Sequence, residues 1–422
     1  MSEKLLYKFA ILLTLLTLVC MGANYYIHPL PTHDGVWTLT PVFSAIQGYW
    51  AEDIFTGYRL PLLHYYLKIP FYLIMGNSIY GPFILNSIIN LLYVFVIVKL
   101  AKKFDLPRLQ SWLIVGLFIS CNTFISLRPE HLINLFLLLY YGFHSRIKKE
   151  WVHIVISLLF LALHPAAGLF AILFNITNSK YAIKNILLDL GVLAISILAI
   201  IFIFPEFVQT MLYTMESRFE GNLHLPLFSF IKSCIFINFY YIYRCVAGNN
   251  MKRDLLQWLV FVILATLLGK DYYYDYVVVF VLYKCISMPH KNEYNSLQTV
   301  LTLVSVCVFP VWHLCLQVQN NSAESNLKQI LYKIGEVVSQ NDRLYEVPME
   351  FALSAMGNQN VILEYHNLEN GTYEPLLKNR HASRLVTEKK QVSQSPETHA
   401  VQWIPIEPNQ KYCLFEIPSL PH

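Results

Sequence analysis

Two adjacent polar residues, His33 and Asp34, lie in the stretch HPLPTHDGVWTLTP, which directly follows a long apolar segment. A carboxylate at such a position can act as a general base that takes the proton of a hydroxyl group, a role worth about 10²- to 10⁴-fold in rate. The structural alternative is a turn, because an aspartate before a glycine also favours one. Residue types alone favour the turn, so the surrounding elements have to decide the role of Asp34.

Other residues with suitable chemistry also lie between apolar segments, and Glu130 is a second candidate acid. The candidate ligands for an anionic group are Arg59, Arg128, His164, Lys270, His33 and His64. Structural alternatives exist, since Arg128 can pair with Glu130 and His164 can end a helix before Pro165. No spacing of His, Cys, Asp or Glu indicates a tight metal site. A loosely bound divalent metal ion near Asp34 is compatible with the sequence.

The elements that position these residues are apolar segments long enough to cross a bilayer. The chain has 422 residues, of which 55% are hydrophobic and 14% charged, and its mean hydropathy is +0.45. A soluble domain cannot bury that much apolar surface. We therefore expect an α-helical polytopic membrane protein. The net charge of +4 is explained by basic cytoplasmic loops, so no nucleic acid is expected as a partner.

The distribution of Lys and Arg fixes the predicted topology, because cytoplasmic loops carry an excess of both. If residues 59–76 lie on the surface as a helix, every basic loop shares the side of Lys4 and Lys8. Within that helix, His64 and Lys68 are predicted to share one polar stripe. About eleven transmembrane helices result, at 9–27, 83–100, 109–126, 132–143, 151–163, 166–176, 186–204, 227–243, 255–268, 276–286 and 297–316.

This topology places the N-terminus in the cytoplasm and all the candidate residues on the outer face. A first surface helix is predicted around Val42 and Ile46, ahead of the helix at 59–76. The tyrosines of GKDYYYDY, from Gly269 to Tyr276, are predicted to form an interfacial aromatic belt. Two juxtamembrane helices in the first outer loop would then frame a polar pocket that contains Asp34.

The composition becomes more polar after Gln317, which predicts two domains: 1–316 in the membrane and 317–422 outside it. The stretch NNSAESNLKQILYKIGEVVSQN has the apolar period of an amphipathic helix. NVILEYHNL and KYCLFEIP have the pattern of strands, and 387–399 is predicted to be a polar loop. A small C-terminal α/β extracytoplasmic domain is therefore expected.

The N-terminal part of the chain resembles the GT-C superfamily of integral-membrane glycosyltransferases. The resemblance lies in a first span, an acid within about ten positions, and a second juxtamembrane helix that begins LPLLHYYLKIPFYLIMG. In that superfamily the second outer loop often carries another functional acid, and here LRPEH supplies Glu130. Two departures are visible: THDG has one acid where many members have two, and Leu60 separates Arg59 from Pro61.

The resemblance implies a transferase that moves a sugar from a polyprenyl- or dolichyl-phosphate-linked donor to an acceptor on the extracytoplasmic face. Asp34 would be the general base, Glu130 a second functional acid, and the outer cations would hold the phosphate. The expected partners are the lipid-linked donor, a glycan, lipid or protein acceptor, and membrane lipids. The expected location is a bacterial plasma membrane, with a role in cell-envelope glycan biosynthesis.

Other functions fit the same layout. A non-enzymatic transporter or flippase of lipid-linked sugars is one alternative, but transporters carry ionisable residues near the bilayer midplane, and here these residues gather at the outer ends of the spans. A polymerase or ligase of surface glycans would share the outer-face chemistry. An inactive assembly partner with a similar fold is a further alternative.

Overall fold

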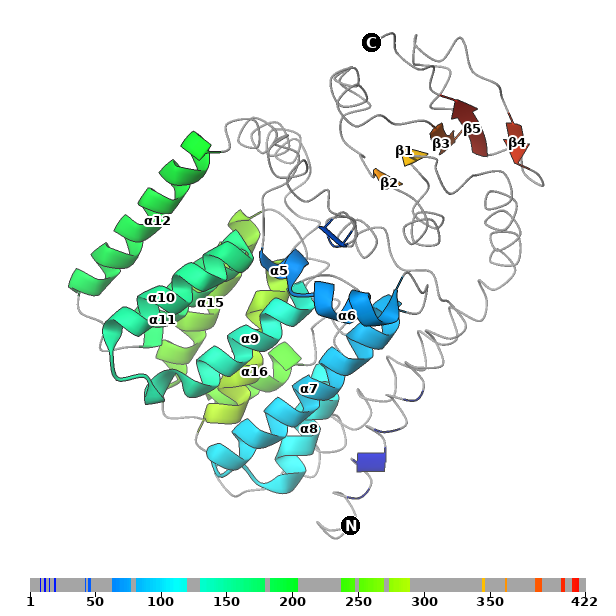
Figure 1. Cartoon of the computed structure of the whole chain (residues 1–422). Helices are drawn as coiled ribbons and strands as arrows, with labels where there is room; N and C mark the ends of the chain where they lie inside the picture. The colour runs from blue at the N-terminus through cyan, green and yellow to red at the C-terminus, as the bar shows by residue number, and fades with distance from the viewer. Residues whose placement is uncertain are drawn as a thin grey trace. The chain divides into compact units, whose positions relative to one another are not determined.

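A computed structural model gives the fold of the chain (Figure 1). It describes residues 63–76, 81–119, 130–178, 183–203, 237–246, 250–268 and 273–288, strand residues at 344–345, 361–362, 384–388, 404–406 and 412–416, and eight single residues between Lys8 and Ile46. The chain forms two compact units. One comprises Met1–Ala23, Ala51–His64 and Asn86–Leu314, and the other Asn24–Trp50, Tyr65–Leu85 and Cys315–His422. The predicted domain boundary at 316 lies outside the described residues and stays a prediction.

Helices make up most of the described chain. Their bounds are α7 (Gly81–Lys103), α8 (Arg108–Ile119), α9 (Glu130–Phe143), α10 (Glu150–Leu163), α11 (Pro165–Asn178), α12 (Ile183–Ile203), α15 (Met251–Leu267) and α16 (Tyr274–Ser287). A short 3₁₀ helix, η2 (His144–Arg146), follows α9, and residues 237–246 are also helical. The predicted helices between 83 and 286 are therefore confirmed, within four residues at every described end.

Among the described residues, one helix meets the criteria of length and composition for a membrane span together: Ile84–Lys103, with 20 residues and a hydropathy of 2.1. Glu150–Leu163, Pro165–Thr177 and Leu190–Ile203 are shorter apolar helices. The predicted span at 297–316 lies outside the described residues, and of 9–27 only Ile11, Leu12, Leu15 and Val19 are described. The count of eleven therefore stays a prediction.

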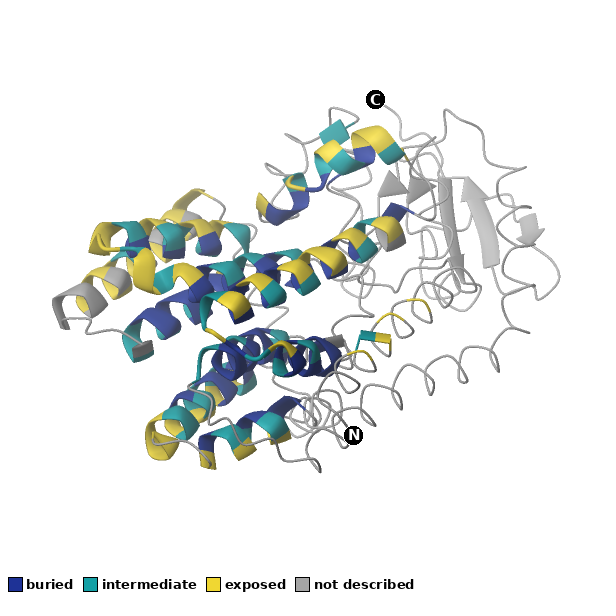
Figure 2. Cartoon of the chain, turned by 90° about the horizontal axis from the view of Figure 1, so that it is seen from below, coloured by how far each residue is buried: buried dark blue, intermediate teal, exposed yellow. Residues whose placement is uncertain are grey.

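Apolar side chains are exposed along α7 on the face opposite to its buried one. Leu91 and Phe95 are 60% and 58% exposed, while Tyr93 and Ile97 are fully buried. Figure 2 shows the same division between exposed and buried faces on other helices of the bundle. Large apolar side chains in contact with solvent are unfavourable in water but favourable against lipid tails, so this surface suits a bilayer.

Stacked aromatic rings fill the core between α11, α15 and α16. Phe170 of α11 stacks on Tyr276 of α16 with ring centroids 5.0 Å apart, and Phe261 of α15 stacks on Phe280 of α16 at 4.0 Å. Each such pair adds about 0.5–1.5 kcal/mol beyond the burial of its area. The core therefore fixes the position of α16 against the two neighbouring helices.

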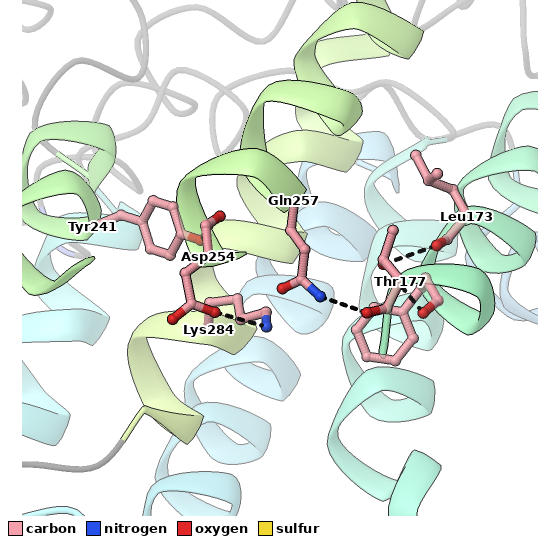
Figure 3. A network of polar contacts seen from close by, with 7 residues as sticks. Leu173, Thr177, Tyr241, Asp254, Gln257 and Lys284 are labelled. Carbon is pink, nitrogen blue, oxygen red and sulfur yellow. Dashed lines mark hydrogen bonds and ion pairs between the residues drawn. The ribbon is translucent and has the colours of Figure 1, made fainter. Parts of the chain in front are cut away.

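A polar network joins the carboxyl ends of α11 and α16 to the amino end of α15 (Figure 3). Lys284 Nζ of α16 lies 3.4 Å from Asp254 Oδ1 of α15, and Tyr241 donates to the Asp254 carbonyl at 2.8 Å. Gln257 Nε2 donates to the carbonyl of Thr177 at the end of α11, at 2.6 Å. Buried polar groups need such partners, and here they tie α11, α15, α16 and residues 237–246 together.

The predicted surface helix at 59–76 is two helices in the described part, α5 (Leu63–Tyr66) and α6 (Ile69–Met75). Pro70 lies in the first turn of α6, where its missing N–H costs nothing, and Gly76 ends α6 at a φ of +61°. The two residues of the predicted polar stripe are both buried. His64 and Lys68 are 1% and 5% exposed, whereas Leu73 and Ile74 are 65% and 85% exposed, so the exposed side of this segment is apolar.

The predicted first surface helix is described at three positions, which test its helical conformation but not its place at the surface. Val42, Ala45 and Ile46 are helical, and Val42 is fully buried. Ala45 and Ile46 are half-buried, so the direction of the predicted apolar face stays a prediction.

The C-terminal part contains a five-stranded sheet of order β2-β1-β3-β5-β4. The strands are β1 (Leu344–Tyr345), β2 (Val361–Ile362), β3 (Arg384–Glu388), β4 (Ile404–Ile406) and β5 (Tyr412–Glu416). β1 pairs in parallel with β2 and β3, while β5 is antiparallel to β3 and β4. The strands predicted in NVILEYHNL and KYCLFEIP are confirmed as β2 and β5. The predicted loop at 387–399 begins too early, since β3 includes Glu388, and the predicted helix after 320 lies outside the described residues.

Candidate functional site

His164 lies at the sharp corner between α10 and α11. It is extended, with φ −163° and ψ 128°, because the ring of a following proline disfavours the helical conformation. Its N–H donates to the Phe160 carbonyl at 2.8 Å and so completes the last turn of α10. A Cβ at Gly168 would lie 2.3 Å from Leu161 Cγ and 2.8 Å from Leu161 Cα. The two helices therefore approach closely only because residue 168 is glycine.

His64 lies beside this corner. Its Nδ1 donates to the Leu163 carbonyl at 2.6 Å, one of the carbonyls that a helix end leaves without an intrahelical partner. The rings of His64 and His164 have centroids 5.9 Å apart. The structure therefore brings together two predicted site residues that lie far apart in the sequence, and it gives His64 a structural role as well.

Two tyrosines complete the cluster. Tyr276 of α16 lies with its hydroxyl 3.3 Å from His164 Nδ1, and the Tyr273 ring centroid lies 6.2 Å from that of His164. Tyr276 and Tyr274 are buried, with 0% and 1% exposure, so their assignment to an interfacial belt is wrong. They face the protein because α16 packs among other helices, which the sequence does not show. We call His64, His164, Tyr273 and Tyr276 the histidine corner.

Burial decides the charge of His164. Desolvation lowers the pKa of its imidazole from 6.5 to about 4, because the charged form loses its hydration. The ring is therefore neutral near pH 7, with one nitrogen as donor and the other as acceptor. At this corner His164 can recognise a phosphate or a sugar hydroxyl by hydrogen bonding, but it adds no positive charge.

Glu130 is the first residue of α9 and is 6% exposed. A negative charge is favourable there because the helix dipole is positive at its amino end. The next residue, His131, anchors the same end of α9 to α7: its Nε2 donates to Asn90 Oδ1 at 2.5 Å, and Tyr93 donates to its carbonyl at 2.9 Å. Sequence reasoning missed the Asn90–His131 pair, although both residues are polar and lie in or beside predicted spans.

The remaining predicted site residues are Asp34, His33, Arg59, Arg128 and Lys270, and all five lie outside the described residues. Their roles stay predictions. Within the described part of the chain, no three His, Cys, Asp or Glu side chains gather in a group that could hold a metal ion. The divalent ion that the sequence allows near Asp34 is untested, because Asp34 lies outside the described residues.

Comparison with known proteins finds a likeness in fold. No family model matches the chain, and no curated protein matches its sequence. The structure is similar to the crystal structure of ArnT from Cupriavidus metallidurans bound to undecaprenyl phosphate, with a TM-score of 0.60 over 97% of this chain and 98% of that one. ArnT is a GT-C glycosyltransferase. The identity is 9%, so the resemblance to the GT-C superfamily is confirmed at the level of the fold.

Proposed function

We propose that this chain is an integral-membrane glycosyltransferase. It transfers a sugar from a polyprenyl- or dolichyl-phosphate-linked donor to an acceptor on the extracytoplasmic face, with Asp34 as general base. In this proposal the N-terminus is cytoplasmic, about eleven helices span a bacterial plasma membrane, and the C-terminal domain with the five-stranded sheet is extracytoplasmic.

One observation carries the proposal: the likeness to ArnT, which was solved with undecaprenyl phosphate bound, extends over 97% of the chain. A likeness that included only a bundle of helices would be weak support, because bundles are common. Here it extends over 98% of the ArnT chain as well. A fold still hosts many functions, so the proposed chemistry has to come from the residues.

The reaction can be written with few groups. The acceptor hydroxyl attacks the anomeric carbon, the bond from that carbon to the phosphate oxygen breaks, and the lipid phosphate leaves. The acceptor proton goes to the Asp34 carboxylate. The lipid phosphate gains negative charge as it leaves, and Arg59, Arg128 and Lys270 are the proposed cations that stabilise it. The lipid tail stays in the bilayer throughout.

The described residues support this proposal in two ways. Glu130 is a buried carboxylate at the amino end of α9, and buried acids in membrane proteins are costly and most often functional. The histidine corner offers neutral hydrogen-bonding groups on a rigid helix junction, which suits the placement of a phosphate or a sugar. In the proposed topology both features lie at the outer ends of their helices.

The experiment is a sugar-transfer assay with the purified full chain in lipid and a polyprenyl-phosphate-linked sugar donor. Asp34→Asn removes the base while keeping the size of the side chain, and Glu130→Gln does the same for the second acid. Asp53→Asn is the matched control, because Asp53 is the competing carboxylate of the same outer loop, which we interpret as a solvated helix cap. We expect Asp34→Asn to lower kcat by about 10²-fold or more, and Asp53→Asn to leave it unchanged.

Two results would count against the proposal. Full activity of Asp34→Asn at normal expression removes the general-base assignment. Absence of any transferred sugar, with lipid-linked sugar instead crossing between leaflets in wild-type vesicles, supports the transporter alternative.

A further inference from the structure

Two cations share one aromatic ring where α9 ends. The Phe143 ring has Lys103 Nζ 4.9 Å from its centroid and the Arg146 guanidinium carbon at 5.3 Å. Lys103 is the last residue of α7, and Arg146 is the last residue of η2. The structure therefore gathers two positive charges from two segments within about 10 Å of each other. We call Lys103, Phe143 and Arg146 the cation pair site.

Lys103 is held in place by its surroundings. Its Nζ donates to the Gly142 carbonyl at 2.5 Å and also lies 5.0 Å from the Phe104 ring centroid. A Cβ at Gly142 would lie 2.4 Å from Leu100 Cδ2, so glycine allows α7 and α9 to approach closely at this point. The ammonium group is thus positioned before any ligand arrives, which lowers the entropic cost of binding.

Neither cation of the site is neutralised by a described acid. Asp105 and Glu150 are the acids nearest to Lys103 and Arg146 in the sequence, and both are exposed. Within the described part of the chain, neither acid forms an ion pair with the two cations. Two like charges that are held together repel each other. An anion placed between them would remove that repulsion and accept hydrogen bonds from both.

The neighbourhood combines further positive charge with apolar surface. Four more basic side chains of the adjoining turns are exposed: Lys102, Arg108, Lys148 and Lys149. Phe143 itself is 37% exposed, and Phe95 on α7 is 58% exposed, with Lys99 Nζ 5.3 Å from the Phe95 ring centroid. Exposed apolar side chains along α7 can contact acyl chains, and basic side chains at the helix end can contact phosphate.

We propose that the cation pair site binds the phosphate head group of an anionic phospholipid, in the leaflet that meets the basic loops. The apolar face of α7 favours a lipid over free phosphate, because a lipid supplies acyl chains to cover it. In the predicted topology this is the cytoplasmic leaflet, opposite to the histidine corner. The site is independent of the proposed transfer reaction, so either proposal can fail without the other.

The experiment measures retained lipid on the purified full chain by native mass spectrometry, after exchange into mixtures of phosphatidylglycerol and phosphatidylcholine. The double variant Lys103→Gln/Arg146→Gln removes the site. Lys252→Gln/Arg253→Gln is the matched control, since it removes two exposed positive charges of the amino end of α15. The double variant also removes the Lys103 hydrogen bond, which can weaken folding. Arg146→Gln keeps that hydrogen bond and changes an exposed residue, so it tests the site separately from folding.

We expect the wild type and the control to retain phosphatidylglycerol in preference to phosphatidylcholine. Arg146→Gln should lower that preference by about tenfold, the worth of one charge-assisted hydrogen bond, and the double variant should abolish it. Equal loss in the control would overturn the proposal, because general basic attraction would then explain the binding. Displacement of the lipid by millimolar inorganic phosphate would overturn the assignment to a lipid.

Discussion

The close approach of α10 and α11 at Gly168 gives the sharpest structural prediction. In Gly168→Ala the new Cβ would collide with Leu161, at 2.3 Å from its Cγ and 2.8 Å from its Cα. The second of these two atoms belongs to the backbone, so a rotamer change of the leucine cannot relieve the collision. The helices have to separate, and the movement disturbs His164 and the Leu163 carbonyl that His64 contacts.

The magnitude follows from two opposing terms. Overpacking in a close-packed interior costs about 1–3 kcal/mol, and the upper end applies because backbone has to move. Replacing glycine by alanine inside a helix returns about 1 kcal/mol. The net expectation for Gly168→Ala is a free energy of unfolding lowered by about 2 kcal/mol.

Two matched variants calibrate this effect. A Cβ at Gly191 in α12 meets nothing within 4 Å, so Gly191→Ala should stabilise the protein by up to about 1 kcal/mol. The three atoms nearest to a Cβ at Gly142 all belong to the Leu100 side chain, which can move, so the stability of Gly142→Ala should fall between those of the other two variants. The assay is thermal unfolding of each purified variant in the same detergent. A Gly168→Ala protein as stable as Gly191→Ala would refute the packing argument.

Three further predictions concern charge and topology. Lys284→Met should lower the free energy of unfolding by about 3 kcal/mol, because it leaves the Asp254 carboxylate poorly solvated and without its lysine partner. Adding Asp254→Asn should restore most of that loss in the same unfolding assay. Burial lowers the pKa values of His164 and His144 from 6.5 to about 4, so between pH 4 and pH 6.5 the unfolded chain binds more protons than the folded one. The free energy of unfolding should therefore be at its full value above about pH 6.5 and fall toward pH 4, by at most about 3 kcal/mol per histidine. An unfolding midpoint independent of pH would contradict this. Asn77→Cys should be labelled by an impermeant reagent from the outer side, and labelling from the cytoplasm would overturn the predicted sidedness.

The sequence predicted the helices well and their partners poorly. Runs such as 83–100 and 151–163 became α7 and α10 with nearly the predicted ends, because apolar length is a local property of the chain. His64 and His164 were singled out separately as site residues, yet their contact depends on how two distant segments pack. Local patterns do not contain that information.

The tyrosines of α16 show the same limit. Tyrosine at the start of a span is typical of an interfacial belt, whereas Tyr276 is fully buried. Its burial follows from stacking on Phe170, a residue of another helix. Similarly, the spacing of His64 and Lys68 predicted a shared polar stripe but not the direction in which it faces. The structure buries both side chains, while apolar side chains such as Leu73 are exposed.

The most direct test of the central claim is the binding of polyprenyl phosphate to the purified full chain. Saturable binding of polyprenyl phosphate, with no competition by the corresponding polyprenol, is the predicted result, because the proposed site recognises the phosphate and its charge. Equal competition by the alcohol, or no saturable binding of the phosphate, would contradict the assignment of this fold to a transferase that uses lipid-phosphate-linked sugars.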